Sequence, residues 1–394
     1  IMHIIELTEL QFKNYSNLHS KKNYRQSVEY ANLEATKGYK KLYLGLSDNQ
    51  DNIHAATLIL EKKLSGKSKY GYIPSGYLIN FYNFELLEIF TNELKDYLKK
   101  QNYIFLRITP LINYQVYNSN FILKENNSGI INNFKRLNYN YIPNNSKYKM
   151  VLTVKDISNT FSSFKRSLRR NINDCLKKGI TVHQGTKEEL DEFLNLIDNK
   201  EYYKKMSSLF NNINNNFEFY FAKLNPETYI NNYRYLLKKE QLKNEILNNK
   251  LKDPTVKKTN NLLNKKMTSD RLITKYHNEI INGTNIYKLH PEGLIISTVA
   301  IITNKREVTF VTEGFNNEFK YIRSTSMIKW EIIKRHLLNG YKVFDLGTIN
   351  INNNYTSKNG FNGNIIEYSN MFDLVINEML YKLNKYAKKA PRIN

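Results

Sequence analysis

Two consecutive helical patterns at residues 226–281, separated by a short break, restrict the fold of this chain more than any other feature. In Pro226–Lys252, seven positions follow one another at steps of three and four residues, and five of them are apolar or aromatic: Ile230, Tyr233, Leu237, Glu240, Asn244, Leu247 and Leu251. That spacing is typical of a coiled-coil seam. Asp253-Pro254 offers an N-cap and a first-turn proline, so we expect a second helix from about Thr255 to Ile281, ended by Asn282-Gly283. Helices joined by so tight a turn run antiparallel, which predicts a hairpin arm at 227–283, about 37 Å long.

The segments on both sides of the arm alternate between strand and helix patterns. Apolar runs predict strands at 42–46, 54–60, 103–110, 180–182, 294–303, 308–312 and 343–347. Periodic apolar positions predict helices at 27–31, 85–100, 164–178, 188–197 and 326–338. Gly179 is placed to end the helix at 164–178 in the left-handed conformation. The fold class is therefore α/β (α+β), with one unit at 1–150 and a second at 151–226 and 284–394.

Positive charge gathers in two places. The chain has 59 Lys and Arg against 36 Asp and Glu, a net charge of +23, part of which reflects a coding bias towards lysine. The predicted helix at 164–178 carries four cations within six residues, which indicates a phosphate-bearing ligand or a solvated face: Lys165, Arg166, Arg169 and Arg170. Between Arg234 and Lys275 the arm has 12 Lys and Arg against four acids, which indicates an RNA contact or, again, a solvated face. The candidates for that contact are Lys257, Lys258, Lys265 and Lys266.

Several common site types are missing from the sequence. It has no glycine-rich phosphate loop, no Gly-x-Ser-x-Gly, and no histidine pair at metal-ligand spacing. The single cysteine, Cys175, excludes a disulfide scaffold and falls inside the basic helix, where a structural role is favoured over a nucleophilic one. With no leader pattern and no apolar run long enough to span a bilayer, we expect a cytoplasmic protein, with peripheral contact at the inner membrane face left open.

The order of six short motifs resembles the Fem aminoacyltransferase family, the enzymes of peptidoglycan interpeptide bridges. The motifs are Tyr24–Val28, Tyr72–Gly76, Leu106–Pro110, Arg169–Ile172 with Lys177–Ile180, Phe344–Gly347, and Ser357–Phe361 with Ile365–Tyr368. The arm is similar to that of the longer, Staphylococcus-type members. The resemblance spans nearly the whole chain and implies two domains of the acetyltransferase (GNAT) type plus an antiparallel coiled-coil arm.

The same resemblance implies the activity. It implies transfer of a small amino acid (Gly, Ser or Ala) from a charged tRNA to an amine of a lipid-linked or nucleotide-linked peptidoglycan precursor, with no metal and no cofactor. Lys358 takes the position of the family lysine that stabilises the developing oxyanion. The implied substrate-binding residues are Gly76, Thr109, Arg169, Arg170 and Phe361, and the arm lysines become candidates for tRNA contact. A homodimer, or a heterodimer with a homologue, is compatible with the sequence.

Four positions depart from the family pattern. Glu34 and Asn215 stand where the family often has a phosphate-contacting lysine and arginine, while Thr109 replaces an aspartate and Val311 a tyrosine. Glu34 repels a diphosphate. Either the anion clamp has moved, with Arg169 and Arg170 as candidates, or the acceptor differs, or the chain is a non-catalytic paralogue that binds tRNA or precursor as a partner or immunity module. An acyl-CoA-dependent N-acyltransferase is a third class, but the sequence lacks the Gln/Arg-x-x-Gly-x-Gly/Ala loop expected for it.

Overall fold

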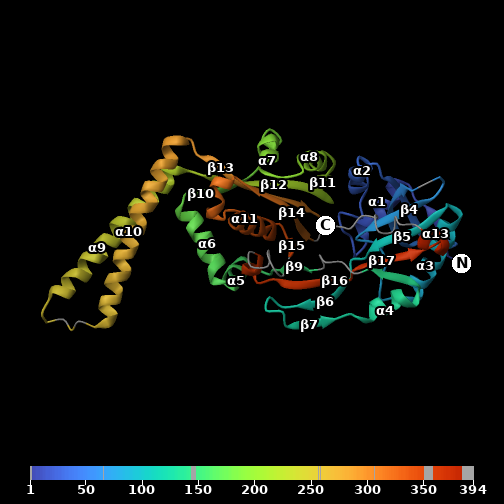
Figure 1. Ribbon diagram of the computed structural model, residues 1–394, viewed down its shortest axis with the longest axis horizontal. Helices are drawn as coiled ribbons and strands as arrows, with labels where there is room; N and C mark the ends of the chain where they lie inside the picture. The colour runs from blue at the N-terminus through green and yellow to red at the C-terminus, as the bar shows by residue number, and fades with distance from the viewer. Residues whose placement is uncertain are drawn as a thin grey trace.

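The computed structural model describes residues 2–64, 66–142, 148–255, 257, 259–305, 307–349 and 358–383. Two mixed β-sheets lie side by side, and a long helical hairpin projects from the far end of the second (Figure 1). The expected α/β class with an inserted antiparallel helical arm is confirmed, and the likeness of each half to an acetyltransferase remains a prediction. In the part of the chain that the structure describes, no helix is both long and apolar enough to cross a membrane.

The first sheet has seven strands in the order β1-β2-β3-β4-β5-β17-β8. Their bounds are His3–Glu6 (β1), Lys40–Ser47 (β2), Ile53–Lys63 (β3), Lys69–Pro74 (β4), Tyr103–Thr109 (β5), Met371–Val375 (β17) and Tyr139–Ile142 (β8). β4 and β5 pair in parallel because α3 (Phe84–Lys100) connects them. Further helices that accompany this sheet are α1 (Glu9–Leu18), α2 (Val28–Ala35), α4 (Gly129–Arg136) and α13 (Glu378–Leu383). Ser27, one residue ahead of α2, caps that helix through its side chain.

The second sheet follows the order β10-β12-β13-β14-β15-β9-β16-β6-β7, with the short β11 beside β12. Its strands are β10 (Ile180–Gln184), β11 (Asn211–Asn212), β12 (Asn215–Leu224), β13 (Leu294–Thr303), β14 (Glu307–Phe315), β15 (Val343–Thr348), β9 (Tyr148–Thr153), β16 (Asn364–Tyr368), β6 (Asn113–Tyr117) and β7 (Leu123–Asn126). The accompanying helices are α5 (Ile157–Ser163), α6 (Arg166–Lys177), α7 (Leu190–Leu196), α8 (Lys200–Leu209), η1 (Asn317–Ile322), α11 (Thr325–Leu338) and η2 (Asn359–Phe361). Gly179 ends α6 with φ +68°, as predicted.

Alternation along β12 explains how one strand serves two cores. Phe219 and Phe221 pack with α7 and α8, whereas Tyr220 and Ala222 pack with α6 and α11 on the other face. The first of these cores also takes in Phe12 and other side chains of the first unit, so the two units share one apolar cluster.

The two sheets exchange strands across the predicted boundary at residue 150. β6 and β7 precede that residue but pair in the second sheet, while β17, near the C-terminus, lies between β5 and β8 in the first. A buried ion pair fixes this return: Arg107 Nε and Nη2 each lie 2.8 Å from a carboxylate oxygen of Asp373. The division into two domains remains a prediction.

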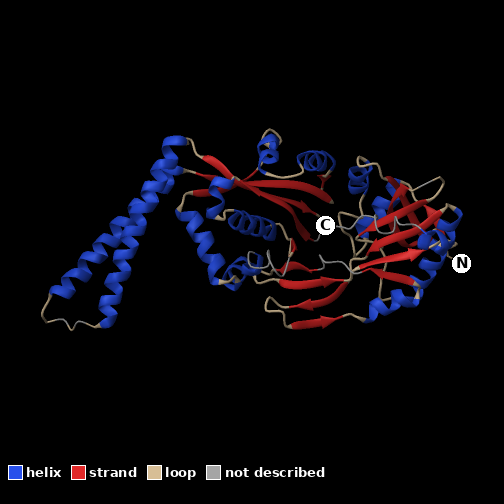
Figure 2. Cartoon of the chain, in the orientation of Figure 1, coloured by secondary structure: helices blue, strands red, loops and turns tan. Residues whose placement is uncertain are grey.

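The arm is an antiparallel pair of helices, α9 (Pro226–Lys252) and α10 (Asn260–Leu289), as predicted (Figure 2). The predicted seam positions are all buried or half-buried. Both predicted ends of the second helix are wrong. α10 begins at Asn260 because the Asp253 side chain accepts the Thr255 N–H at 2.8 Å and forms a turn instead of a helix cap.

The predicted stop at Gly283 is wrong for a different reason. Gly283 lies inside α10, where a Cβ would stand 3.0 Å from Ile230 Cγ1 of α9. The glycine therefore lets the two helices approach closely and does not terminate the second one. α10 continues to Leu289 and leads into β13.

Candidate active site

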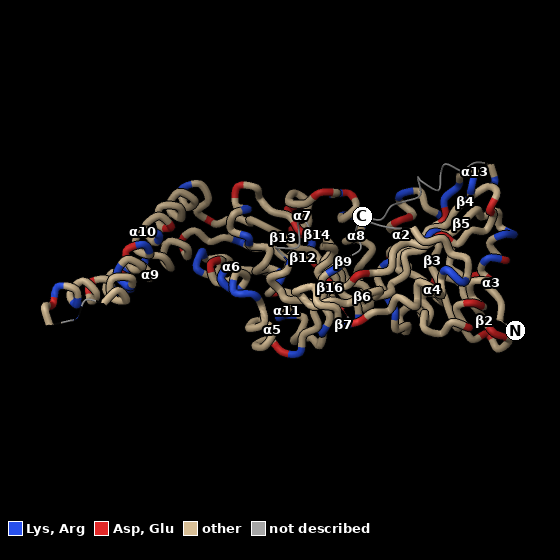
Figure 3. The backbone as a smooth tube through the Cα atoms, turned by 60° about the horizontal axis from the view of Figure 1, so that its bottom comes forward, with Lys and Arg blue, Asp and Glu red and all other residues tan. Residues whose placement is uncertain are grey.

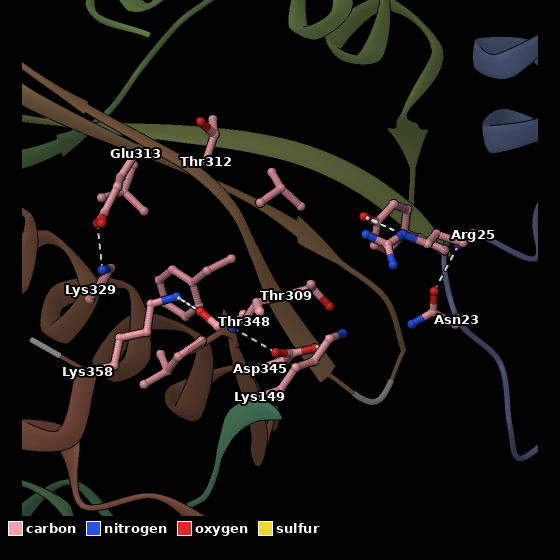
Figure 4. A pocket seen from close by; sticks show the side chains of 16 residues that line it. Asn23, Arg25, Lys149, Thr309, Thr312, Glu313, Lys329, Asp345, Thr348 and Lys358 are labelled. Carbon is pink, nitrogen blue, oxygen red and sulfur yellow. Dashed lines mark hydrogen bonds and ion pairs between the residues drawn. The ribbon is translucent and has the colours of Figure 1, made fainter. Parts of the chain in front are cut away.

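A cavity of about 280 Å³ opens where β14 and β15 stop pairing. These two strands form a parallel ladder only between 307–309 and 343–345, although both continue beyond it. The cavity is lined by side chains of both strands, by Lys149 of β9 and Lys329 of α11, and by Asn23–Arg25 from the first unit (Figure 4). The site therefore lies between the two units and draws on both.

Lys358 immediately precedes η2, and its side chain projects into this cavity. Its Nζ donates to the Thr348 carbonyl oxygen at 2.7 Å. Burial and the charge of Lys329 lower the pKa of Lys358 to about 8, against the opposing effect of Glu313. An ammonium group with this pKa is protonated at neutral pH and can donate a hydrogen bond, and it loses its charge as the pH rises through about 8. Ser357, the first residue of the motif that pointed to Lys358, lies outside the described residues.

Two other cations in the cavity are paired. Lys329 Nζ lies 2.6 Å from Glu313 Oε2, and Lys149 Nζ lies 3.0 Å from Asp345 Oδ2. Burial acts to raise the pKa of Glu313, but the charge and hydrogen bond of Lys329 hold it below its ordinary value. The other Asp345 oxygen accepts the Gly347 N–H at 2.8 Å.

Arg25 is one of the cavity residues that sequence reasoning missed, as are Lys149, Glu313 and Lys329. The Arg25 Nε donates to the Tyr24 hydroxyl at 3.2 Å, and its backbone N–H donates to Asn23 Oδ1 at 3.0 Å. Tyr24 is the largest influence raising the pKa of Arg25 above its ordinary value, so the guanidinium stays charged. The sequence contained a signal for it, since Arg25 belongs to the first of the family-like motifs.

Four of the predicted substrate-binding residues do not line the cavity. Thr109 Oγ1 accepts the Ser75 N–H at 3.3 Å and joins the ends of β4 and β5. At Gly76 a Cβ would lie 2.5 Å from Ile73 Cγ2, so the position has no room for a side chain. Arg169 and Arg170 lie on α6, half-buried and exposed respectively. The structure does not bring these residues together with Lys358 in one cavity, and their roles remain predictions.

Phe361 belongs to the core. Its ring is 2% exposed and packs edge-on against Phe164 at a centroid distance of 5.1 Å. It follows Lys358 closely and is buried beneath the segment that carries the lysine.

The candidate tRNA-contact lysines lie at and beyond the tip of the arm. Lys257 and Lys265 are exposed, while Lys266 pairs with Asp270 at 2.5 Å. Lys258 lies outside the described residues. Figure 3 shows Lys and Arg spread along both arm helices and gathered on α6, which agrees with the two charged segments identified in the sequence.

The positions that depart from the family pattern have partners within the protein. Glu34 pairs with Lys37 at 2.8 Å, and the Asn215 Nδ2 donates to Glu29 at 3.1 Å. Val311 lines the cavity. Neither Glu34 nor Asn215 supplies a cation, so any diphosphate clamp of this chain lies elsewhere.

Two further kinds of group bear on the chemistry of the chain, metal-ligand clusters and the single thiol. Across the described ranges, no three His, Cys, Asp or Glu side chains are grouped to hold a metal ion. Cys175 is buried, and burial raises the pKa of its thiol to about 12, which keeps it protonated. What the cavity offers is positioned positive charge.

Comparison with known proteins bears on the activity. The chain is 25% identical over 432 residues to the aminoacyltransferase FemA of Staphylococcus epidermidis, covering 99% of this chain and all of the relative. It is also 25% identical to FemA of Staphylococcus aureus, covering 99% of both. The crystal structure of FemX has the same fold, with a TM-score of 0.72 at 17% identity over 97% of this chain and 99% of FemX.

The FemAB family model matches residues 7–389, nearly the full length. The family and enzyme class expected from the motifs, an acyltransferase of the aminoacyltransferase kind, are thereby confirmed. This chain is a member of the FemAB family.

Proposed function

We propose that this chain transfers a small amino acid (Gly, Ser or Ala) from charged tRNA to an amine of a peptidoglycan precursor, on the stem peptide or the growing cross-bridge. The observation that carries the proposal is the Lys358 ammonium, held in a cavity between the two units at the end of the β14–β15 ladder. Family membership supplies the reaction class.

The chemistry is aminolysis of an activated ester. The acceptor amine attacks the ester carbonyl carbon, a C–N bond forms, and the C–O bond to the ribose breaks. The proton lost by the amine leaves with the ribose oxygen. Lys358 donates a hydrogen bond to the carbonyl oxygen as its negative charge develops, so positioning and charge stabilisation carry the reaction and no cofactor is required.

The substrates also match the distribution of charge. The arm and α6 present the basic surface that tRNA phosphates favour. A lipid-linked precursor places the enzyme at the inner face of the membrane as a peripheral cytoplasmic protein, where the net charge of +23 favours an anionic surface. A homodimer or heterodimer with a homologue stays compatible with this arrangement.

The test is a transfer assay with purified protein. Gly-, Ser- and Ala-tRNA, each labelled on the amino acid, are mixed in turn with lipid-linked and with nucleotide-linked precursor. We expect the label to move to the precursor from at least one tRNA. Absence of transfer in all six combinations would contradict the proposal.

A second candidate is a non-catalytic family member that binds tRNA or precursor as a partner of an active enzyme. The observation that favours it is the engagement of Glu34 and Asn215 with partners inside the protein, where a phosphate clamp is expected. Salt-sensitive tRNA binding without transfer in the same assay supports this candidate over the first.

A further inference from the structure

Arg25 brings a positive charge into the cavity from the opposite side to Lys358 (Figure 4). It comes from the connection between α1 and α2, whereas Lys149, Lys329 and Lys358 come from the second unit. The ion pair of Lys149 and Asp345 lies between Lys358 and Arg25 in this view (Figure 4). A ligand that spans the cavity therefore has Lys358 at one end and Arg25 at the other.

The guanidinium is held in place by aromatic neighbours. Its Nε is occupied by the Tyr24 hydroxyl at 3.2 Å, and its carbon stands 5.5 Å from the centre of the Tyr24 ring. That ring is itself buried and packs edge-on against Tyr30 at 5.9 Å and Phe210 at 6.1 Å. With Nε fixed, the two Nη groups keep one orientation.

Arg25 differs from Lys149 and Lys329 in having no carboxylate partner among the described residues. Lys329 has Glu313 and Lys149 has Asp345, but among the residues that the structure describes no carboxylate forms an ion pair with Arg25. A charge that is partly removed from water without a counterion costs free energy. An anionic ligand group at this place would offset that cost.

The number of available cations favours a carboxylate over a diphosphate. One guanidinium offers two parallel N–H donors, which match the two oxygens of a carboxylate. Lys149 and Lys329, which line the same cavity, are already paired with Asp345 and Glu313, and Glu34 and Asn215 add no positive charge.

We propose that Arg25 binds a carboxylate of the acceptor peptide and thereby sets the distance between that carboxylate and the amine that reacts beside Lys358. The inference rests on the proposed function for the identity of the acceptor. It assigns Arg25 to substrate binding and selection, and leaves the stabilisation of the reacting carbonyl to Lys358.

The experiment measures binding of the acceptor without tRNA. Stem peptides with every carboxylate free, and peptides with each carboxylate in turn converted to a carboxamide, are titrated into the full chain by calorimetry. We expect conversion of one particular carboxylate to weaken binding about 10- to 100-fold, as for loss of a charge-assisted bidentate pair. Arg25→Gln should bind the acid and that amide equally, and Arg25→Lys should recover part of the difference.

Arg136→Gln is the matched control, because Arg136 is an exposed arginine of α4 that stacks on Phe84 away from the cavity. It should keep the wild-type preference for the acid. Equal binding of acid and amides by the wild type overturns the proposal. So does Arg25-dependent binding of a nucleotide diphosphate-sugar that lacks the peptide, since the anion is then a phosphate. A retained carboxylate preference without transfer from any charged tRNA supports the Arg25 site and contradicts only the proposed function.

Discussion

Lys358 and Arg25 hold their charges in opposite ways, and this difference decides what each can do. Lys358 is desolvated and close to Lys329, so its pKa falls to about 8, while the tyrosine beside Arg25 raises the pKa of that guanidinium. Lys358 is therefore the group of the cavity whose charge is easily lost near neutral pH. A hydrogen-bond donor with a lowered pKa suits a transient oxyanion, whereas a permanent charge suits a stable anion.

Replacing Lys358 with alanine should slow transfer by about 10²- to 10³-fold, the usual loss when one oxyanion donor is removed. Lys358→Arg keeps the charge and should retain part of the activity. Single-turnover transfer rates at saturating acceptor measure the effect. Ser326→Ala serves as the control, because Ser326 lies at the start of α11 and does not line this cavity. Unchanged turnover in Lys358→Ala would remove the role assigned to the lysine.

The rate of transfer should fall as pH rises through about 8, because Lys358 must be protonated to donate to the carbonyl oxygen. Glu313 raises the pKa of Lys358, so Glu313→Gln should move the alkaline decline to lower pH. Lys358→Arg should abolish the decline below pH 10, since arginine stays charged. Rate profiles between pH 6 and 10 measure both shifts. If the transfer rate of Lys358→Arg still falls near pH 8, the group that titrates is not Lys358.

At the scale of elements, the arm shows what sequence can and cannot predict. The seam from Ile230 to Leu251 repeats steps of three and four residues over seven positions, and all seven are buried or half-buried in the structure. The ends of α10 depend on single side chains with two possible uses: Asp253 makes a turn, and Gly283 makes room. A local pattern does not distinguish a glycine that ends a helix from one that faces a neighbouring helix.

Gly283→Leu should destabilise the arm by about 1–3 kcal/mol, because the new side chain collides with Ile230. Gly129→Leu is the control: it is a glycine in α4 whose Cβ position has no atom within 4 Å. Hydrogen exchange of α9 and α10 amides measures the loss locally. Faster exchange confined to the arm is expected for Gly283→Leu, and exchange equal to that of Gly129→Leu would show that the contact carries no weight.

For the site, sequence reasoning located one end of the cavity. Lys358 was identified by its motif, but Arg25 was not, because the cavity joins segments more than 300 residues apart. Phe361 shows the opposite case: it is close to Lys358 in sequence, but its side chain lies in the core. The two sheets also share strands, because β6 and β7 pair in the second sheet and β17 pairs in the first. No local sequence pattern predicts this exchange.

That exchange also determines how the whole molecule unfolds. β17 arrives from the C-terminal end of the chain to complete the first sheet, and the cluster around Phe12 and Phe219 spans both units. Neither unit has a complete sheet or core without the other's segments. The two units should therefore unfold together in one transition, despite the predicted division at residue 150.

Asp373→Ala tests this coupling, because it removes the carboxylate that faces Arg107 and leaves a buried cation without it. Breaking a buried pair in this way costs about 3–5 kcal/mol. We expect one transition, monitored by circular dichroism and by Trp330 fluorescence in the second unit, that shifts to lower urea with both probes coincident. Glu378→Ala is the control, because its pair with Lys382 is exposed at both ends and contributes little. Two separate transitions, with only circular dichroism shifted, would show that the first sheet unfolds independently of the second.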